Sequence, residues 1–366
     1  MSAQSQDLSF KPVRNAEPKH LTQSQIEDFN RNGFVRPLDV FAAAEVARNR
    51  DYFYALLAQR PQNGAYAINC YQARCEGLWD ICTAPRILDY VEDLIGPNIV
   101  CWASHFFCKL PHDPLLVPWH QDAPYWKLSS TGTVTAWLAI DDADAENSAM
   151  RFIPGTHRLG KLEIRKSQNN TVLELETVNA DLLGEPTFDC LNAGQISLHA
   201  DMLVHGSLPN RSARRRCGLT IRYCPPEVGF SDEKWARSVE PILCRGRDTS
   251  GRWQHHPRPA GNDVSPENSP AHDVRTHQVF NIVEYSWRCA NIPKAFAAGL
   301  VTVDGVGAVL RSLRQQGVEV IPVSGDLGSW EHVQRSHKAI AVEGLDLRLR
   351  QMFGAGVAHG FEGKVL

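Results

Sequence analysis

The sequence predicts a mainly β fold, an antiparallel roll of two packed sheets with flanking helices. Between residues 99 and 225, short runs of apolar and aromatic residues are separated by turn residues, a pattern typical of antiparallel strands and not of a parallel α/β sheet. Before residue 97, apolar residues follow helical spacing between capping residues. The 366 residues exceed one typical domain, so we expect one large domain with an appendage.

Three helices are expected in the first hundred residues, each from a local start signal. The signals are Thr22 with Gln25 as a capping box, Asp39 as an N-cap, and Pro85 at a first helical turn. They predict helices over residues 23–32, 40–59 and 86–95, with a short strand at 34–35. We expect these helices to cover one face of the roll.

Strands are expected from residue 99 onward, and the aromatic and apolar run at 100–110 is the longest of them. The other expected strands lie at 117–122, 133–140, 149–153, 171–178, 195–198, 203–205 and 218–225. The acidic connection at 141–147 lacks the ligand spacing and the glycine of a calcium loop. We interpret it as a solvated turn.

Two candidate metal ligands lie in the segment Val117-Pro118-Trp119-His120-Gln121-Asp122. If this segment is extended, its side chains alternate, so His120 and Asp122 point the same way. A lone H-x-D is common by chance, but His205 follows His120 by 85 positions, a separation that suits two distant strands of one barrel. Two histidines and one carboxylate form the facial triad of non-haem Fe(II) oxygenases, which leaves coordination positions open.

A cation suited to the far carboxylate of a 2-oxo acid follows this histidine. Arg216 lies 11 positions beyond His205, and a turn at Pro209-Asn210 would bring it onto the neighbouring strand. Its planar guanidinium can bind a carboxylate in two places at once. Alternation puts Gly218 and Thr220 on the face of Arg216, so the glycine would leave room beside the guanidinium for a dicarboxylate.

Three blocks in order carry a family resemblance: V-P-W-H-Q-D at 117–122, the run from Thr135 to Arg158, and H-G-S-L-P-N at 205–210 followed by Arg216. With them the sequence resembles the phytanoyl-CoA dioxygenase (PhyH-like) family of Fe(II)/2-oxoglutarate-dependent oxygenases. The resemblance implies a double-stranded β-helix core, a jelly roll of the cupin kind. It fades near residue 262, so we expect a catalytic domain with N-terminal helices over 1–262 and a C-terminal α/β extension of unknown role over 263–366.

The resemblance also implies roles for individual residues. The implied iron ligands are His120, Asp122 and His205, and the implied 2-oxoglutarate contacts are Arg216, Ser207, Trp137 and His157. Fe(II), 2-oxoglutarate and O₂ would then oxidise an unactivated C–H bond of a small metabolite or natural-product intermediate, with release of succinate and CO₂. Hydroxylation is the expected outcome.

Several alternatives remain open from the sequence alone. Desaturation, cyclisation or epoxidation would use the same residues, and a non-catalytic metal-binding cupin would keep them. The presence of Asp122 argues against halogenation, for which a small residue replaces the carboxylate. A rival H-x-D at His199-Ala200-Asp201 lies only six positions from His205, so all three could converge only through a sharp turn.

Substrate contacts are harder to assign from sequence. Trp119, Tyr125 and Trp126 surround the H-x-D segment and could form an aromatic wall for the substrate or belong to the core. Lys109 could be a substrate contact or a surface cation. The sequence does not identify the substrate, because fold does not choose among chemistries.

Composition bounds the remaining properties. The net charge of −3 and the isoelectric point near 6.5 argue against nucleic acid or an anionic membrane as the main partner and leave a small-molecule substrate. Ten cysteines without a C-x-x-C pair, and no apolar segment at the start, predict a reduced, cytoplasmic chain. Residues 263–366 could support a homo-oligomer.

Overall fold

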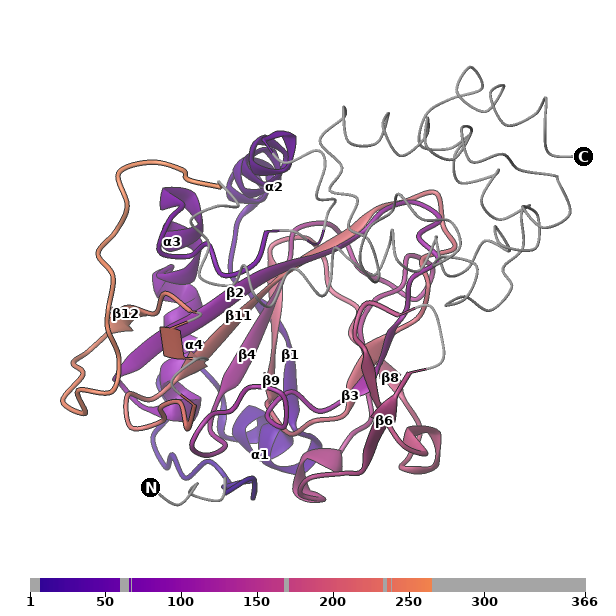
Figure 1. Cartoon of the computed structure of the whole chain (residues 1–366), viewed down its shortest axis with the longest axis horizontal. Helices are drawn as coiled ribbons and strands as arrows, with labels where there is room; N and C mark the ends of the chain where they lie inside the picture. Colours follow the sequence, from indigo (N-terminus) through magenta and orange to yellow (C-terminus); the bar gives the residue numbers. More distant parts are fainter. Residues whose placement is uncertain are drawn as a thin grey trace, which may run out of the picture. The chain divides into compact units, whose positions relative to one another are not determined.

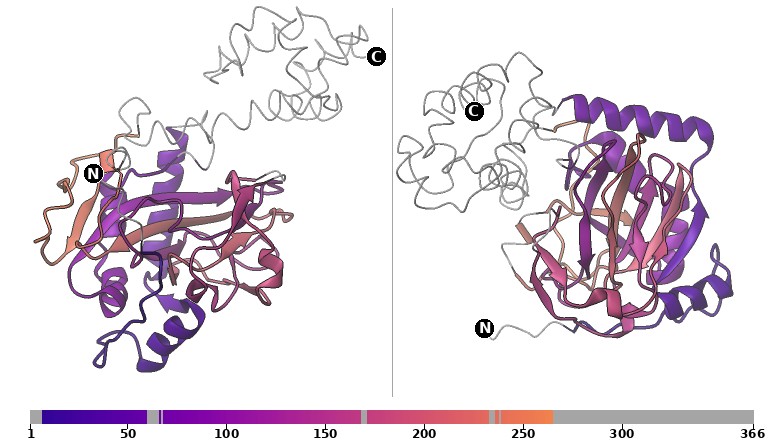
Figure 2. Two further views of the ribbon diagram at one scale, coloured as in Figure 1. Left: turned by 60° about the horizontal axis from the view of Figure 1, so that its bottom comes forward. Right: turned by 90° about the vertical axis from the view of Figure 1, so that its right-hand side faces the viewer.

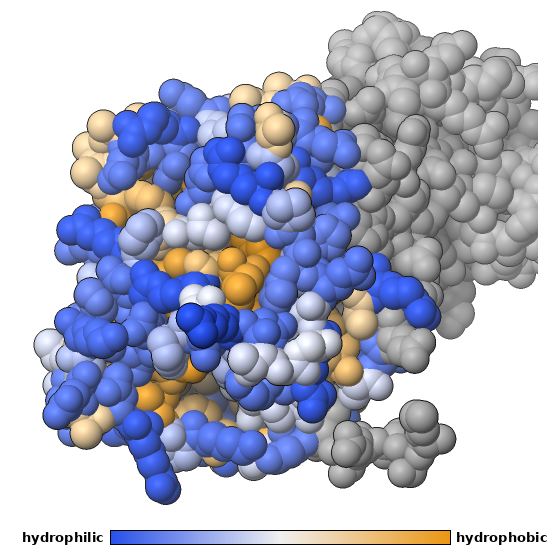
Figure 3. Space-filling model, turned by 90° about the vertical axis from the view of Figure 1, so that its left-hand side faces the viewer, coloured by the Kyte–Doolittle hydropathy of each residue, from blue (hydrophilic) through white to orange (hydrophobic). Residues whose placement is uncertain are grey.

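The computed structural model describes residues 7–59, 66, 68–167, 171–232, 236–237 and 239–264. Within them, two β-sheets face each other and helices lie outside one of the sheets (Figure 1). The predicted mainly β, double-sheet architecture is confirmed. Hydrophilic side chains dominate the face drawn in Figure 3, with apolar ones visible in the hollows between them.

The larger sheet, as far as the described residues form it, is antiparallel throughout and has six strands in the order β1-β9-β4-β11-β2-β12. Their bounds are β1 Phe34–Asp39, β2 Ile99–Lys109, β4 Val134–Ala139, β9 Gln195–Ala200, β11 Arg216–Cys224 and β12 Ile242–Arg245. Strand β11 is central, because it pairs with β2 on one side and with β4 on the other.

In the smaller sheet, the described chain contributes four strands in the order β3-β10-β5-β8. These strands are β3 Val117–His120, β5 Arg151–Phe152, β8 Thr187–Phe188 and β10 His205–Ser207. A separate hairpin joins β6 Ile164–Lys166 to β7 Leu175–Thr177, and short 3₁₀ helices occupy Thr156–Arg158 and Ala180–Leu182. Of these elements, β6, β8 and β12 were not predicted from the sequence.

The described residues before β2 form four α-helices: α1 Gln23–Asn32, α2 Ala43–Ala58, α3 Glu76–Cys82 and α4 Pro85–Ile95. Helix α1 has the predicted capping box, and α4 begins at the predicted Pro85. The prediction that Asp39 caps α2 is wrong, because Asp39 pairs with Gln195 as the last residue of β1. The helix instead begins after Ala42, whose N–H donates to the Glu45 carboxylate. Helix α3 was not predicted.

Helices and the larger sheet share one hydrophobic core. Alternation turns Cys217, Leu219 and Ile221 of β11 toward this core, on the side of the strand opposite to the predicted face of Arg216. They pack in one buried cluster with residues of α2, α3 and α4, such as Phe53, Leu78 and Val91. The opposite face of the larger sheet looks toward the smaller sheet, as Figure 2 shows, and is free to carry polar side chains.

One predicted strand pairing is wrong. Arg216 does not lie on a strand beside His205, because β11 joins the larger sheet while β10 belongs to the smaller one. The connection between them crosses from sheet to sheet, and the Asn210 amide fixes it by donating to the carbonyls of Leu110 and Arg214, at 2.9 and 2.7 Å. Arg216 therefore approaches the smaller sheet from across the roll.

The predicted α/β extension lies outside the described residues from position 265 onward, so this extension and the boundary at residue 262 stay predictions. In the part of the chain that is described, no helix has both the length and the apolar character needed to cross a membrane.

Candidate metal centre

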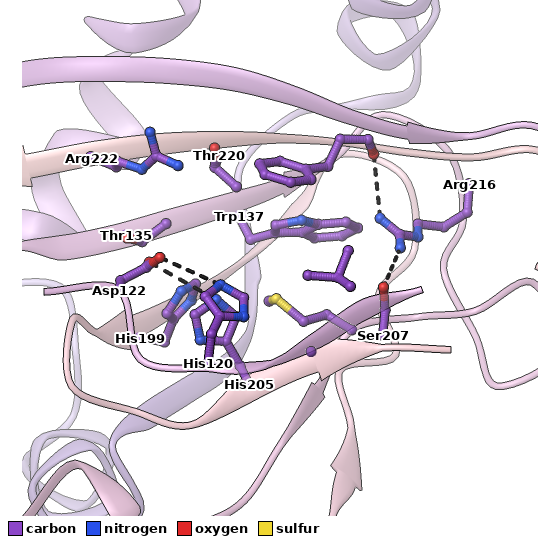
Figure 4. Close-up of a pocket in the computed structure, with 14 residues that line it drawn as sticks. His120, Asp122, Thr135, Trp137, His199, His205, Ser207, Arg216, Thr220 and Arg222 are labelled. Atoms are coloured by element: carbon purple, nitrogen blue, oxygen red, sulfur yellow. Dashed lines mark hydrogen bonds and ion pairs between the residues drawn. The ribbon is translucent and has the colours of Figure 1, made fainter. Parts of the chain in front are cut away.

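Three potential ligands converge between the two sheets. His120, Asp122 and His205 are buried, and one donor atom from each lies within 4.8 Å of the others. The Nε2 atom of His120 lies 3.6 Å from Asp122 Oδ1, and that of His205 lies 3.9 Å from Asp122 Oδ2. Figure 4 shows the three side chains pointing toward one another at the edge of a pocket. Such a group can hold a metal ion on one side and leave the other side open.

Strand pairing explains this convergence. His120 ends β3 and lies directly opposite His205 in β10. As the sequence predicted, two strands bring together histidines that are 85 positions apart. Asp122, however, lies in a turn after β3 and not on the strand itself. Its carbonyl accepts a hydrogen bond from Tyr125 N–H, and this turn, not strand alternation, directs the carboxylate toward the two histidines.

The histidine rings are held in the form that a metal requires. Nδ1 of His120 lies 2.8 Å from the Pro118 carbonyl oxygen, and Nδ1 of His205 lies 3.0 Å from that of Leu203. Because a carbonyl oxygen can only accept, each Nδ1 carries the proton and each Nε2 presents its lone pair toward Asp122. Two imidazoles and one carboxylate suit a borderline divalent metal such as iron. The residues present therefore fit an Fe(II) ion.

Charge states agree with this fit. Burial raises the pKa of the Asp122 carboxyl, but attraction to the imidazoles of His205 and His120, when these are protonated, outweighs it and holds the pKa below its usual range. Burial, with repulsion from His120, lowers the pKa of His205 well below its usual value. Neutral imidazole and ionised carboxylate are the forms that bind a metal.

A buried arginine lies at the other end of the same pocket (Figure 4). The Arg216 guanidinium donates to Ser207 Oγ at 3.2 Å, to the Ser148 carbonyl at 2.9 Å and to the Phe107 carbonyl at 3.3 Å. Among the described residues, no carboxylate forms an ion pair with it. A buried cation without an anionic counterpart is costly, which makes an anionic ligand at this end favourable.

Trp137 forms the wall between the two ends. The Arg216 guanidinium carbon lies 5.7 Å from the centroid of its ring. A Cβ atom on Gly218 would lie 2.0 Å from Trp137 Cζ2, so this position must be glycine for the indole to fit. The space at Gly218 is thus filled by Trp137, and the sequence-based idea that it is left for a dicarboxylate is wrong.

His157 and Lys109 were named as pocket residues from the sequence, and neither lines the pocket in the structure. The ring of His157 packs edge-on against Phe10, and its Nε2 lies 3.1 Å from the Asn30 carbonyl oxygen. Lys109 is fully buried and donates to the carbonyls of Leu115 and Leu208. Both residues tie segments of backbone together, so Lys109 is neither of the two alternatives that the sequence left open.

The three aromatic residues near the H-x-D segment also lie outside the residues that line the pocket. Trp119 turns away from His120 along β3 and donates to Asp181 Oδ1 at 2.9 Å. Tyr125 meets the ring of His120 edge-on at 6.2 Å and donates to the Leu175 carbonyl. Trp126 belongs to a buried cluster with Trp102. The core interpretation fits Trp126 best.

Sequence reasoning assigned no pocket role to Thr135 or Arg222 and considered His199 only as part of the rival H-x-D. Thr135, His199 and Arg222 line the pocket beside the three potential ligands. Extending the alternation of β11 from Arg216 by six residues would have placed Arg222 on the same face. His199 comes from the rival H-x-D, and burial lowers its pKa to about 4. Its companion Asp201 instead accepts hydrogen bonds from the backbone N–H groups of Gly132 and Thr133.

A jelly roll that holds two histidines and one carboxylate between its sheets defines the class of facial-triad metalloproteins. A family model described as Phytanoyl-CoA dioxygenase (PhyH) matches residues 29–218, just over half of the chain. The chain belongs to this family of Fe(II)/2-oxoglutarate-dependent oxygenases. Fe(II) and 2-oxoglutarate are the metal and cosubstrate typical of the family.

Two relatives illustrate the range of the family. The peroxisomal phytanoyl-CoA dioxygenase of Bos taurus is 30% identical over 170 residues, which cover 43% of this chain and 49% of that protein. The L-proline trans-4-hydroxylase of Streptomyces griseoviridis is 25% identical over 193 residues, which cover 45% of this chain and 72% of that protein. The match thus spans about half the length of the bovine relative.

Solved structures share the fold. The non-haem monooxygenase ThoJ in its apo form aligns with a TM-score of 0.55 at 25% identity, covering 68% of this chain and 93% of that one. The enzyme EctD from S. alaskensis, also in its apo form, aligns with a TM-score of 0.53 at 19% identity, covering 68% and 94%. The similarity to EctD supports the double-stranded β-helix fold alone.

Proposed function

We propose that this chain is an Fe(II)/2-oxoglutarate-dependent hydroxylase that acts on a small molecule. His120, Asp122 and His205 would hold the iron. Arg216, oriented by Ser207, would bind the C5 carboxylate of 2-oxoglutarate beside Trp137. No nucleic acid or membrane is needed for this function.

One observation carries the proposal: the three potential metal ligands and a buried arginine that has no ion pair among the described residues open into one pocket. Neither feature is decisive by itself, since histidine–carboxylate clusters and buried arginines also occur in purely structural networks. A dicarboxylate cosubstrate accounts for both together, because one end can meet the metal while the other meets the guanidinium.

When bound, Fe(II) and 2-oxoglutarate supply O₂ activation coupled to oxidative decarboxylation, which yields succinate and CO₂. The protein contributes positioning. The hydrogen bonds from Nδ1 of His120 and of His205 fix both rings, and the carbonyls of Ser148 and Phe107 fix the Arg216 fork. Trp137 fills the wall and keeps water from that side. No side-chain general base is required for C–H oxidation.

Hydroxylation is the default outcome, because insertion of one oxygen atom from O₂ into a C–H bond requires no side chain besides the metal ligands and the cosubstrate contacts. Desaturation, cyclisation or epoxidation by the same residues is the alternative. Asp122 leaves no vacant position for a halide. The relatives named above are called a phytanoyl-CoA dioxygenase and an L-proline hydroxylase, so both acyl thioesters and free amino acids are reasonable first substrates to try.

The test is succinate formation across such a panel, followed by mass analysis of the product. We expect turnover that requires Fe(II), 2-oxoglutarate and O₂ together, a product heavier by one oxygen atom, and loss of turnover in His205→Ala. A product lighter by two hydrogens would mean that the enzyme carries out desaturation or cyclisation instead of hydroxylation. Metal binding with no succinate under any condition would indicate a non-catalytic cupin.

A further inference from the structure

The pocket has a second polar end, beyond the metal ligands as seen from Arg216 (Figure 4). Arg222, Thr135 and His199 form it, and they lie in one row across three neighbouring strands. Arg222 of β11 is directly opposite Thr135 of β4, and Thr135 is directly opposite His199 of β9. Their side chains therefore share the face that looks into the roll.

Several polar atoms of this row have no hydrogen-bond partner among the described residues. Thr135 and His199 are each only 1% exposed, and the Thr135 hydroxyl and both ring nitrogens of His199 have no hydrogen bond within the described chain. The Nε atom of Arg222 is also buried and has no hydrogen bond within the described chain. Buried polar groups are nearly always satisfied, so three neighbouring residues with free polar atoms point to a ligand that is bound there.

Arg222 supplies a fixed positive charge. Its guanidinium carbon lies 5.5 Å from the ring centroid of Trp102 and 5.0 Å from that of Trp126, so the two indoles hold it in place. No ion pair connects it to an acidic side chain among the residues that the structure describes. This contrasts with its neighbours Arg214 and Arg215, which pair with Asp144 and Asp141.

Charge balance favours an anion here. Of the described residues that line the pocket, Asp122 alone is acidic. With Fe(II) and 2-oxoglutarate bound, Asp122 and the two cosubstrate carboxylates would oppose the metal and the two arginines. One positive charge remains uncompensated in a pocket with a mostly buried lining, where unpaired charge is costly. Both cosubstrate carboxylates already have a place, at Arg216 and at the metal.

We propose that Arg222, Thr135 and His199 form a carboxylate-binding subsite that anchors the substrate next to the metal. This inference rests on the proposed function and narrows it, since the substrate class becomes small molecules with a free carboxylate. Arg222 lies beyond the residues that the family model matches, 29–218. The subsite is thus a feature of this chain that the family match leaves undefined.

The test uses acetate as the smallest carboxylate and acetamide as its neutral counterpart. Both are ¹³C-labelled and added without O₂ to the full chain, loaded with Fe(II) and saturating 2-oxoglutarate so that Arg216 is occupied. A carboxylate held beside high-spin iron should show fast ¹³C relaxation in the NMR spectrum. We expect strong enhancement for acetate and little for acetamide.

Variants assign the effect to the subsite. Arg222→Gln should weaken acetate binding about tenfold or more, because a charge-assisted contact is lost, and Arg222→Lys should retain part of it. Thr135→Val should weaken it to a smaller extent. Arg214→Gln, which removes an exposed, ion-paired arginine, is the matched control and should behave like the wild type.

Three results would overturn the inference. Equal relaxation by acetate and acetamide in the wild type would show no carboxylate preference. Unchanged acetate binding in Arg222→Gln would place the anion elsewhere. If Arg222→Gln instead weakens 2-oxoglutarate as much as Arg216→Gln does, Arg222 holds the cosubstrate and not the substrate. Failure of the wild type to bind 2-oxoglutarate with Fe(II) would reject the proposed function itself, and this inference with it.

Discussion

Arg216 is the residue on which the cosubstrate assignment rests. Three backbone or hydroxyl acceptors orient its guanidinium, yet no carboxylate among the described residues neutralises it. Charge-assisted contacts contribute about 1.5–3 kcal/mol, so we expect Arg216→Ala to weaken 2-oxoglutarate about 10- to 150-fold. Arg216→Lys should recover only part of this loss, because an ammonium cannot reproduce the planar fork.

The measurement is the 2-oxoglutarate dependence of succinate formation, with iron affinity followed separately and expected to stay unchanged. Arg214→Ala serves as the control, since Arg214 pairs with Asp144 and Glu146 at the surface. A large effect of Arg222→Ala on 2-oxoglutarate, together with none of Arg216→Ala, would mean that Arg222 and not Arg216 holds the cosubstrate.

Gly218 makes a second prediction at the scale of one residue. An added Cβ would collide with the indole of Trp137, and such overpacking costs about 1–3 kcal/mol. We expect Gly218→Ala to lower the free energy of unfolding in urea by this amount and to weaken 2-oxoglutarate as Trp137 shifts. Gly261→Ala is the control, because nothing lies within 4 Å of the added atom. Equal stability of the two variants would mean that the indole moves freely.

At the scale of elements, His157 joins the N-terminal segment and α1 to the roll. Burial lowers its pKa from 6.5 to about 4, so between these values the unfolded chain binds a proton that the folded chain does not. Stability should therefore fall as the pH drops from about 7 toward 4. In His157→Gln this part of the fall should disappear from urea unfolding curves, measured on the metal-free protein.

The control for this prediction is His112→Asn, since His112 is exposed in a left-handed turn that asparagine tolerates. It should keep the pH dependence of the wild type. A His157→Gln curve parallel to the wild-type curve would show that other groups set the acid sensitivity.

Element boundaries were predictable where the signal is local. The capping box of α1 and Pro85 of α4 act within one helical turn. Asp39 carried an equally good local signal, but its backbone is taken up by pairing with β9, and that competition is invisible in the sequence. The same holds for Asp122, whose direction depends on a turn and not on the strand period.

At the scale of the whole molecule, the sequence predicted which residues lie together but not which strands pair to bring them together. The period of two along β11 correctly separated the core side from the pocket side. The same period could not show that β11 joins the sheet opposite β10. Side chains would alternate in the same way if β11 lay beside β10 in one sheet. His157 shows a limit of family resemblance. The resemblance implied a 2-oxoglutarate contact, but the ring instead contacts the Asn30 carbonyl of α1.

All the side chains assigned above to the candidate site lie at or before position 222, so we expect a shortened chain to retain the site. Asn262, Asp263 and Val264 pack on the segment at 71–75, through a β-bridge, a backbone hydrogen bond and burial of the valine. A chain ending at Val264 should therefore fold and bind Fe(II) and 2-oxoglutarate with the affinities of the full chain. One ending at Pro259 should unfold at lower urea concentration. Metal binding without 2-oxoglutarate binding by the longer form would mean that a later residue reaches the cosubstrate.

Anaerobic titration of the full chain with Fe(II) and 2-oxoglutarate tests the central claim most directly. We expect one Fe(II) per chain and a visible charge-transfer band that requires both additions. Asp122→Ala should lose iron affinity and the band, because the only carboxylate of the three-ligand group is removed. If Asp122→Ala matches the wild type in iron stoichiometry, affinity and spectrum, the metal is bound elsewhere and the proposed site is wrong.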